Sequence, residues 1–346
     1  MNWLSAEETM SDRVMIVAEI SANHGHDIEV VKRSILKAKE MGCDAAKIQS
    51  YTPDTITLDC DNEYFQIDTG TIWDGTTLYK LYSEAFMPWE WHEELFDYAR
   101  SIDFTLFSTP FDKTAVDLLE KCGNPVYKIA SFEITDIPLI KYAARSGKPM
   151  IISTGIATEE EIRDAVEACH QEGNYDVCLL KCTSEYPARI EDANLDTMQD
   201  MAERFGCKTG LSDHTTGDEV AVVAASMGAA VVEKHFILDK AIGGPDASFS
   251  MTPEEFGEMV RKIRLVEKIR GKVTYELTEK KINSRKYARS LFVAKDVKAG
   301  DVITEENVRS VRPSNGMAPK YFETILGKLF KHDSKKGTPL TEDDIK

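Results

Sequence analysis

Short, nearly continuous apolar runs alternate along the chain with longer amphipathic stretches, beginning at residue 15. Such runs are typical of strands buried on both faces, as in a parallel sheet covered by helices. The predicted strands are residues 15–20, 45–50, 105–109, 126–131, 150–154, 177–182, 208–212 and 229–235. The segments between them, such as DIEVVKRSILKAKEMG and TEEEIRDAVEACHQEG, have apolar residues at helical spacing.

This alternation predicts the fold class. Eight strand–helix units in about 260 residues favour a (β/α)8 TIM barrel over an open doubly wound sheet. No GxGxxG motif follows the first strand, which also argues against a dinucleotide-binding sheet. Helix start signals agree with the division, because Thr158 precedes an acidic first turn and Pro253 opens the last helix.

The pattern changes after residue 270. Residues 271–287 are strongly charged, and residues 288–346 have short strands and frequent turns. We therefore predict a loose extension over residues 1–13, a barrel over 14–270, a linker over 271–287 and a small β-rich domain over 288–346. A domain of roughly 60 residues buries little apolar surface, so we expect it to dock on another surface.

A long insertion, residues 51–87, follows the second predicted strand. Loops of this length in compact domains are usually functional or disordered. Its aromatic residues favour an ordered segment: Tyr51, Tyr64, Phe65, Trp73, Tyr79 and Tyr82. Two interpretations stay open, a wall or lid over the barrel mouth and ordinary packing beneath a long loop.

Composition limits the function classes. The net charge of −17 argues against non-specific binding to nucleic acid or to an anionic membrane, so an anionic substrate needs locally placed cations. The seven cysteines include no CxxC pair and lie mostly in apolar runs, as reduced thiols of a cytoplasmic protein do. No apolar run approaches the ~18 residues of a membrane span, and the first residues are too acidic for a signal peptide.

Two histidines suggest a metal site. His214 and His235 each follow a predicted strand and are 21 residues apart, the spacing of neighbouring parallel strands joined by a helix. Two neutral imidazoles suit Mn, Fe, Co or Zn and leave coordination positions open. Taken alone, either histidine could instead be a hydrogen-bonded group at a strand end.

Polar side chains also end the other predicted strands, where active sites of TIM barrels form. Lys47 and Lys128, with nearby Ser and Thr hydroxyls, predict a phosphate-binding site, although each lysine alone could be solvated. Glu19 and Glu133 could act as acid and base, or form ion pairs with the lysines. Asp246 follows on a glycine-rich loop that could bind sugar hydroxyls or make a turn.

Ordered motifs connect these residues to a known family. The segments AEISANHG, AKIQSYTPDTITLD, FSTPFD, YKIASFEI, ISTG, KCTSEYP, GLSDHT, EKHF, GGPD and RPSNG together resemble the sialic acid synthase family. The resemblance covers residues 14 to about 346. Within the family, TPDTITL, GTIWDG, PWEWH and KCTSEYPA are most similar to the branch that makes pseudaminic acid.

The resemblance implies a TIM barrel followed by a small antifreeze-like (SAF) domain, in a homodimer that swaps this domain onto the partner barrel. It implies a transferase that condenses phosphoenolpyruvate with an N-acetylated amino sugar and water, releasing phosphate by C–O cleavage. The implied acceptor is 2,4-diacetamido-2,4,6-trideoxy-altropyranose, and the N-acetylneuraminate and legionaminate branches use other sugars. The implied cofactor is a divalent metal, Mn²⁺ or alternatively Mg²⁺ or Co²⁺, that polarises the sugar aldehyde.

The resemblance also implies roles for single residues. Metal ligands match His214 and His235, and catalytic carboxylates match Glu19 and Glu133. The positions that hold phosphoenolpyruvate match Lys47, Thr109, Lys128, Ser131, Ser153, Ser184 and Ser212. The positions near the sugar match Gln49, Tyr186, Asp246 and, from the SAF domain of the neighbouring subunit, Arg312. Ser184 replaces an Asn that is usual in the N-acetylneuraminate branch, which leaves open whether Ser184 or Lys181 contacts phosphate.

Two other functions remain to be separated from this one. The barrel could be a divalent-metal aldolase or a 3-deoxy-sugar-acid phosphate synthase, although the SAF tail and the lack of an obvious second phosphate site argue against this. The chain could also be a non-catalytic carbohydrate-binding protein, although its intact histidines, Lys128 and Glu133 favour an enzyme. Sequence does not identify the acceptor, since that choice depends on a pocket built by loops.

Overall fold

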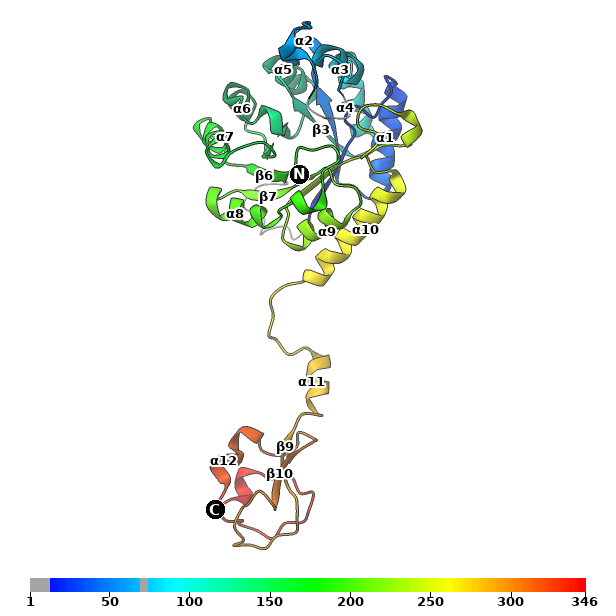
Figure 1. The fold of residues 1–346 in the computed structure, drawn as a ribbon. Helices are drawn as coiled ribbons and strands as arrows, with labels where there is room; N and C mark the ends of the chain where they lie inside the picture. The colour runs from blue at the N-terminus through cyan, green and yellow to red at the C-terminus, as the bar shows by residue number, and fades with distance from the viewer. Residues whose placement is uncertain (1–12, 69–73) are drawn as a thin grey trace. The chain divides into compact units, whose positions relative to one another are not determined.

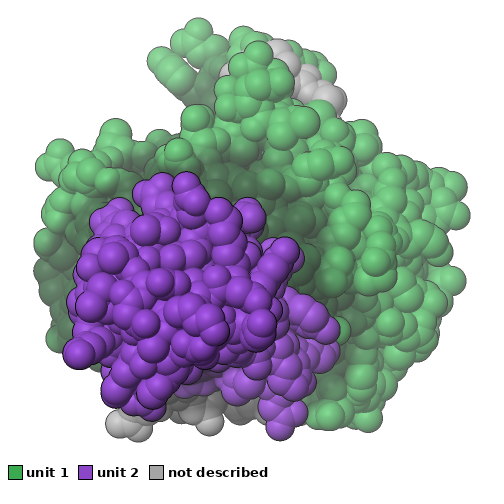
Figure 2. All heavy atoms as spheres, turned by 90° about the horizontal axis from the view of Figure 1, so that it is seen from below, with its two compact units in different colours: residues 1–271 green, residues 272–346 purple. Residues whose placement is uncertain are grey.

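The computed structural model describes residues 13–68 and 74–346, which form two compact units divided after Gly271 (Figures 1 and 2). Most of the predicted N-terminal extension, together with Trp73 and most of the GTIWDG stretch, lies outside the described residues. Each unit has its own hydrophobic core, so the two are described separately.

The first unit is a closed barrel of eight parallel strands in sequence order, which confirms the predicted fold class. The strands are β1 Met15–Glu19, β2 Ala45–Ser50, β3 Thr105–Pro110, β4 Tyr127–Ile129, β5 Met150–Ser153, β6 Val177–Cys182, β7 Lys208–Asp213 and β8 Val231–His235. The strand predicted over 126–131 has only three residues, because the chain turns into a 3₁₀ helix, Ser131–Glu133.

Helices surround the barrel (Figure 1). They are α1 Ile28–Glu40, α2 Pro53–Ile56, α3 Leu78–Ala85, α4 His92–Ser101, α5 Lys113–Cys122, α6 Ile137–Ala144, α7 Glu159–Gln171, α8 Asp196–Phe205, α9 Glu219–Ser226 and α10 Pro253–Arg270. Thr158 and Thr252 begin α7 and α10 with capping boxes, in which the threonine and a glutamate three residues on satisfy each other's backbone N–H groups. Nowhere in the described part of the chain does a helix combine the length and apolar character needed to cross a membrane.

The barrel interior is layered. Because successive strand residues point to opposite faces, every second residue of each strand enters the interior. The lower layers are apolar and fully packed: Met15, Val17, Ala45, Phe107, Val126, Ile151, Cys178, Leu180 and Val231. The next inward positions, at the carboxyl ends of the strands, are polar, so the apolar residues form a floor beneath a polar mouth.

The insertion after β2 is partly helical, and its aromatic residues divide into two groups. Tyr51 is 3% exposed and packs against Tyr82 and Phe111, with ring centroids 5.6 and 5.1 Å away. Tyr64 is 80% exposed. Burial, with a smaller contribution from Glu133, raises the pKa of Tyr82. Tyr51 and Tyr82 therefore pack together inside the fold, whereas Tyr64 lies at its surface.

The second unit, residues 272–346, contains α11 Glu279–Arg285, a two-stranded antiparallel sheet of β9 Ser290–Val293 and β10 Val308–Val311, and α12 Phe322–Ile325. Its core is small: Leu291, Val293, Val297, Ile303, Val308, Ile325, Phe330 and Leu340. The segment predicted as a linker contains α11, which no buried residue anchors.

Candidate active site

Four buried charged residues form a network at the mouth. Lys47 Nζ lies 2.7 Å from Glu19 Oε2 and 3.5 Å from Glu233 Oε1. Lys128 Nζ lies 3.2 Å from the same Glu233 oxygen. All four side chains are 5% exposed or less, so water screens their interactions weakly.

Burial and neighbouring charges shift the pKa values of this network in different directions. Burial lowers the pKa of Lys128. Burial also opposes the charge of Lys47, but Glu19 and Glu233 outweigh it and raise the Lys47 pKa. Burial raises the pKa of Glu19, whereas the two lysines overcome burial at Glu233 and lower its pKa to about 2. Glu233 is therefore the fixed anion of the network, and Lys128 is the cation that an added anion would stabilise most.

Three polar side chains predicted as ligands complete this layer. Lys47 Nζ donates to Thr109 Oγ1 at 3.1 Å, and Ser212 Oγ donates to Glu233 Oε1 at 3.2 Å. Gln49 Nε2 lies 3.3 Å from Glu19 Oε1. These contacts hold the groups in place from β2, β3, β7 and β8.

A second group of hydroxyls meets at Gly155. Gly155 N donates to Ser131 Oγ at 3.2 Å. A Cβ at this position would lie 2.2 Å from Ser184 Oγ and 2.9 Å from Ser131 Oγ, so only glycine lets the backbone approach both hydroxyls. Lys181 instead points away from the barrel interior, between the inward-facing Leu180 and Cys182, and donates to the Cys182 carbonyl at 3.0 Å. Of the two candidates, Ser184 is the one that faces the other hydroxyls.

Glu133 is a half-buried acid, two residues after Ser131. Burial raises its pKa to about 7, which Lys128 only partly offsets. Within the described residues, Glu133 Oε2 and Ser153 Oγ are buried without a hydrogen-bond partner. Buried polar atoms are rarely left in this state, and catalytic sites are among the exceptions.

His214 and His235 lie together, with ring centroids 5.3 Å apart. His214 Nδ1 is 2.9 Å from the Thr183 carbonyl oxygen, which fixes the ring. His235 Nδ1 is buried and lacks a hydrogen-bond partner among the described residues, and burial lowers the pKa of this imidazole well below its usual value. A neutral imidazole with an unsatisfied nitrogen beside a second histidine fits a divalent metal. The described residues contain no group of three or more His, Cys, Asp or Glu arranged to hold a metal, so water or substrate would supply the other ligands.

Aromatic and acidic side chains surround the histidines. The Tyr186 ring is 4.4 Å from His214 and 5.3 Å from Phe249, measured between centroids. Asp246 Oδ2 lies 3.7 Å from His235 Nδ1 and accepts from the Ala22 backbone N–H at 3.3 Å. The predicted sugar-binding residues Tyr186 and Asp246 are thus both adjacent to the histidine pair.

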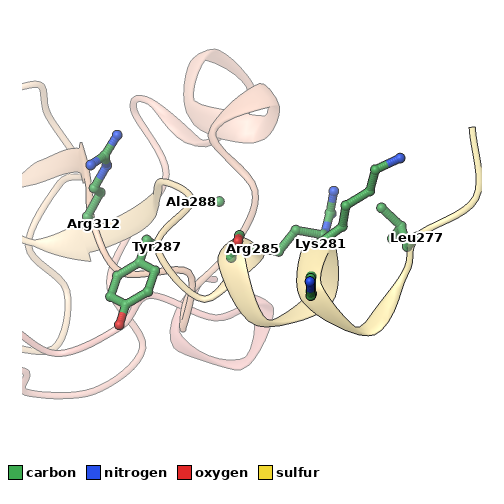
Figure 3. Close-up of a pocket in the computed structure, with 8 residues that line it drawn as sticks. Leu277, Lys281, Arg285, Tyr287, Ala288 and Arg312 are labelled. Carbon is green, nitrogen blue, oxygen red and sulfur yellow. The ribbon is translucent and has the colours of Figure 1, made fainter. Parts of the chain in front are cut away.

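Arg312 is the predicted site residue that belongs to the other unit. Figure 3 shows it with Lys281, Arg285 and Tyr287 around a cavity of about 570 Å³. The cavity lies entirely within the second unit, and four of its eight lining residues are basic. All other predicted site residues belong to the barrel unit.

Sequence reasoning assigned no role to three members of the site, although it placed Glu233 at the end of a strand beside His235. Glu233 contacts both Lys47 and Lys128. Its role in the mouth could have been predicted, because Glu233 precedes His235 by two residues on one strand and therefore faces the same way. Phe249, whose ring centroid is 5.0 Å from that of His235, was hidden in a loop without periodicity. Ser21 accepts from Gln49 Nε2 at 2.9 Å with a φ of +48°, a left-handed conformation that its sequence does not signal.

Comparison with known proteins identifies the family of both units. The model of the NeuB family matches residues 34–275, and that of the SAF domain matches residues 288–346. The pseudaminic acid synthase of Helicobacter pylori is 46% identical over 95% of this chain and 97% of its own length. The N,N'-diacetyllegionaminic acid synthase of Campylobacter jejuni is 34% identical over 95% of this chain and 99% of its own length.

A solved structure is similar in fold. The N-acetylneuraminic acid synthetase of Leptospira borgpetersenii, in complex with citrate, has a TM-score of 0.70 and 29% identity over 79% of this chain and 90% of its own. The resemblance inferred from the ordered motifs is therefore confirmed along nearly the whole chain. With a barrel, an SAF domain and relatives of nearly equal length, this chain belongs to the NeuB family.

Proposed function

We propose that this chain is a pseudaminic acid synthase, which condenses phosphoenolpyruvate with 2,4-diacetamido-2,4,6-trideoxy-altropyranose and water. The observation that carries the proposal is 46% identity to the Helicobacter pylori enzyme over 95% of the chain. Legionaminate and N-acetylneuraminate synthesis are the alternatives, and the lower identity of 34% to the legionaminic acid enzyme favours the first assignment.

Phosphoenolpyruvate would bind at Lys47 and Lys128. Two buried ammonium groups with nearby Thr109, Ser131 and Ser184 hydroxyls can bind its phosphate and carboxylate by charge-assisted hydrogen bonds. An anion beside Lys128 would offset the burial that lowers the pKa of this lysine. Ser153 at the end of β5 and Ser212 near the end of β7 occupy inward-facing positions and could orient the same groups.

The reaction makes one C–C bond and one C–O bond, the latter from water, and breaks the C–O bond that joins the pyruvyl carbon to phosphate. The methylene carbon of phosphoenolpyruvate bonds to the aldehyde carbon of the open-chain sugar, and the aldehyde oxygen takes up a proton. Water then adds to the adjacent cationic carbon and loses one proton, which balances the proton taken up by the aldehyde oxygen. The C–O bond to phosphate then breaks, and the new hydroxyl gives its proton to the departing phosphate to leave a ketone. Glu133 would accept the water proton, since its pKa of about 7 lets it exchange protons near neutral pH. Glu19, which is paired with Lys47, would lie near the carbon that becomes positively charged and would stabilise that charge.

His214 and His235 would hold a divalent metal, for which we propose Mn²⁺. When bound, such an ion supplies Lewis acidity toward the sugar aldehyde. Asp246 and Tyr186 lie beside the histidines and would orient the sugar hydroxyls and its acetamido groups. Gln49, whose Nε2 lies 3.3 Å from Glu19 Oε1, would also contact the sugar.

We also propose a homodimer in which the SAF domain of one copy covers the barrel of the other and contributes Arg312. The two units carry opposite net charge: residues 272–346 have 16 Lys and Arg against 11 Asp and Glu, and residues 1–271 have 26 against 48. The second unit also exposes the apolar side chains of Leu277 and Tyr287 beside its basic cavity. All seven cysteines are free thiols, which supports a reducing compartment, and we propose the cytoplasm.

Phosphate release from phosphoenolpyruvate, measured with three candidate sugars, tests the proposal. The 6-deoxy altrose-type sugar should support release with Mn²⁺, and a chelator should abolish it. Release with N-acetylmannosamine or with the legionaminic acid precursor instead would keep the mechanism and change the acceptor. Sugar binding without release would favour a non-catalytic carbohydrate-binding protein, and release that survives chelation would contradict the metal role.

A further inference from the structure

A buried ion pair joins the two strands that carry the histidines. Asp213 is the last residue of β7 and immediately precedes His214, and Lys234 immediately precedes His235 on β8. The two strands are paired with Asp213 opposite Lys234. Asp213 Oδ2 and Lys234 Nζ are 2.7 Å apart, and both side chains are 1% exposed. Because neighbouring strand residues point to opposite faces, this pair faces away from the mouth.

Thr215 closes the network on the other side of His214. Asp213 Oδ1 accepts from Thr215 N at 2.9 Å and from Thr215 Oγ1 at 2.8 Å. Lys234 Nζ donates to the Thr215 carbonyl oxygen at 2.5 Å. The residues on both sides of His214 are therefore bonded to one another and to the residue that precedes His235.

Stability alone does not explain a charged pair at this place. Removing two charges from water costs several kcal/mol per ion in typical cases, and well-packed apolar residues often give equal or greater stability. What the pair adds is geometry, since four directional contacts fix the backbone that carries both imidazoles. The pair faces away from the mouth, so it cannot act by touching a substrate there.

We propose that the Asp213–Lys234 ion pair is a positioning device that sets the separation and orientation of His214 and His235 for a divalent metal. The inference rests on the metal role proposed above. Imidazoles that bind a metal need their lone pairs directed at one point, and a backbone shift of either strand would misdirect one ring.

The informative variant is the double substitution Asp213→Asn with Lys234→Met. Asn keeps the oxygen that accepts from Thr215, while neither charge is left buried alone. Lys234→Met by itself would leave the Asp213 carboxylate buried and unpaired, which is strongly destabilising. A matched control is Arg264→Met, which removes ion pairs to Asp44 and Glu267 from another part of the barrel unit.

Mn²⁺ affinity of metal-stripped protein, measured by calorimetry, is the primary measurement, with thermal unfolding in the absence of metal beside it. The double variant should bind Mn²⁺ on the order of 10- to 100-fold more weakly, the usual effect of changing groups that support metal ligands. Its activity should recover toward the wild-type kcat as Mn²⁺ is raised. Arg264→Met should melt at a lower temperature with unchanged Mn²⁺ affinity.

Two results would overturn the inference. Only the second would also contradict the proposed metal site. Unchanged Mn²⁺ affinity in the double variant would reduce the pair to a stabilising contact and leave the proposed function intact. Failure of the wild-type protein to bind Mn²⁺ would remove both the positioning role and the metal assignment.

Discussion

The mouth of the barrel and the cavity of the second unit both gather basic side chains, but in opposite surroundings. Lys47 and Lys128 are 3% and 2% exposed and are paired with Glu19 and Glu233. The cations around the second cavity, Lys280, Lys281, Arg285 and Arg312, are all exposed. Similar charges therefore occupy a buried site with paired carboxylates in the barrel and an exposed surface in the second unit.

The difference shows how cations acquire a function. Buried ammonium groups held by fixed carboxylates are oriented before a substrate arrives, and the low dielectric makes each interaction strong. Exposed cations are screened by water and salt, and their side chains must lose rotamer freedom to make a contact. The second cavity would become a strong anion or dipole site only when another surface covers it, which agrees with the proposed dimer.

Among the variants considered, Lys128→Met, which alters the buried cations of the mouth, should reduce activity most. Removing one oriented charge from the mouth should lower kcat/KM for phosphoenolpyruvate by about 10³-fold. Steady-state kinetics with circular dichroism will separate this from misfolding. Lys181→Met is the control, because Lys181 points away from the interior, and its activity should stay near wild type. A similar loss in both variants would show that position at the mouth does not matter.

Glu133→Gln should have the next largest effect, about 10²-fold on kcat. The wild-type rate should rise as the pH passes about 7, where Glu133 ionises, and the variant should lose this dependence. Burial raises the pKa of Glu133 above its usual 4.5, so the folded protein loses stability as the pH rises from 4.5 to about 7. The variant should therefore gain stability relative to wild type over that range in chemical unfolding. A pH profile identical to wild type would contradict the assigned role.

Arg312→Ala tests the exposed cations of the second unit. It should lower kcat/KM for the sugar about tenfold, the effect of losing one charge-assisted hydrogen bond. Mixing this variant with Lys128→Met under conditions of subunit exchange provides a sharper experiment. In a swapped dimer, one barrel with an intact Lys128 receives an intact Arg312, so about a quarter of the wild-type activity should return. No recovery, with exchange verified by mass spectrometry, would mean that Arg312 acts within its own chain or not at all.

Lys298→Ala should have the smallest effect. Lys298 pairs with Asp333 on the second unit at 2.7 Å, with side chains 79% and 59% exposed. Surface pairs of this kind contribute little, so the free energy of unfolding should change by less than about 1 kcal/mol, with no change in kcat. A larger change would mean that this surface is covered in the assembled protein.

The sequence predicted the barrel and most of its mouth because both follow from local rules. Apolar runs located the strands, and parallel strands bring residues such as Lys47 and His235 to one end regardless of the details of packing. Strand alternation also excludes Lys181 once the register of β6 is known, but the end of a strand cannot be located to one residue from the pattern alone. Whether Ser184 or Lys181 faces the other hydroxyls of the mouth could therefore be decided only from the structure.

Other features depend on tertiary contacts that leave no periodic pattern. The place of Tyr51 against Tyr82, and of Phe249 beside His235, is set by loops whose sequences are not repetitive. The Asp213–Lys234 pair lies within two motifs, GLSDHT and EKHF, that were identified for their histidines. The position of Arg312 relative to any barrel depends on a second chain in the proposed dimer, which a single sequence does not encode.

The apolar floor of the barrel has a consequence for the order of events. Val17, Phe107 and Ile151 are fully buried beneath the charged layer, so they close the barrel interior below the lysines, and a substrate of the mouth would arrive from the carboxyl ends of the strands. Lys47 and Lys128 lie on the strands themselves, whereas Tyr186 and Asp246 lie in loops beyond the strand ends. In the proposed reaction, phosphoenolpyruvate held by the lysines would then enter before the sugar occupies the opening, and it would not be replaced until the larger product had left.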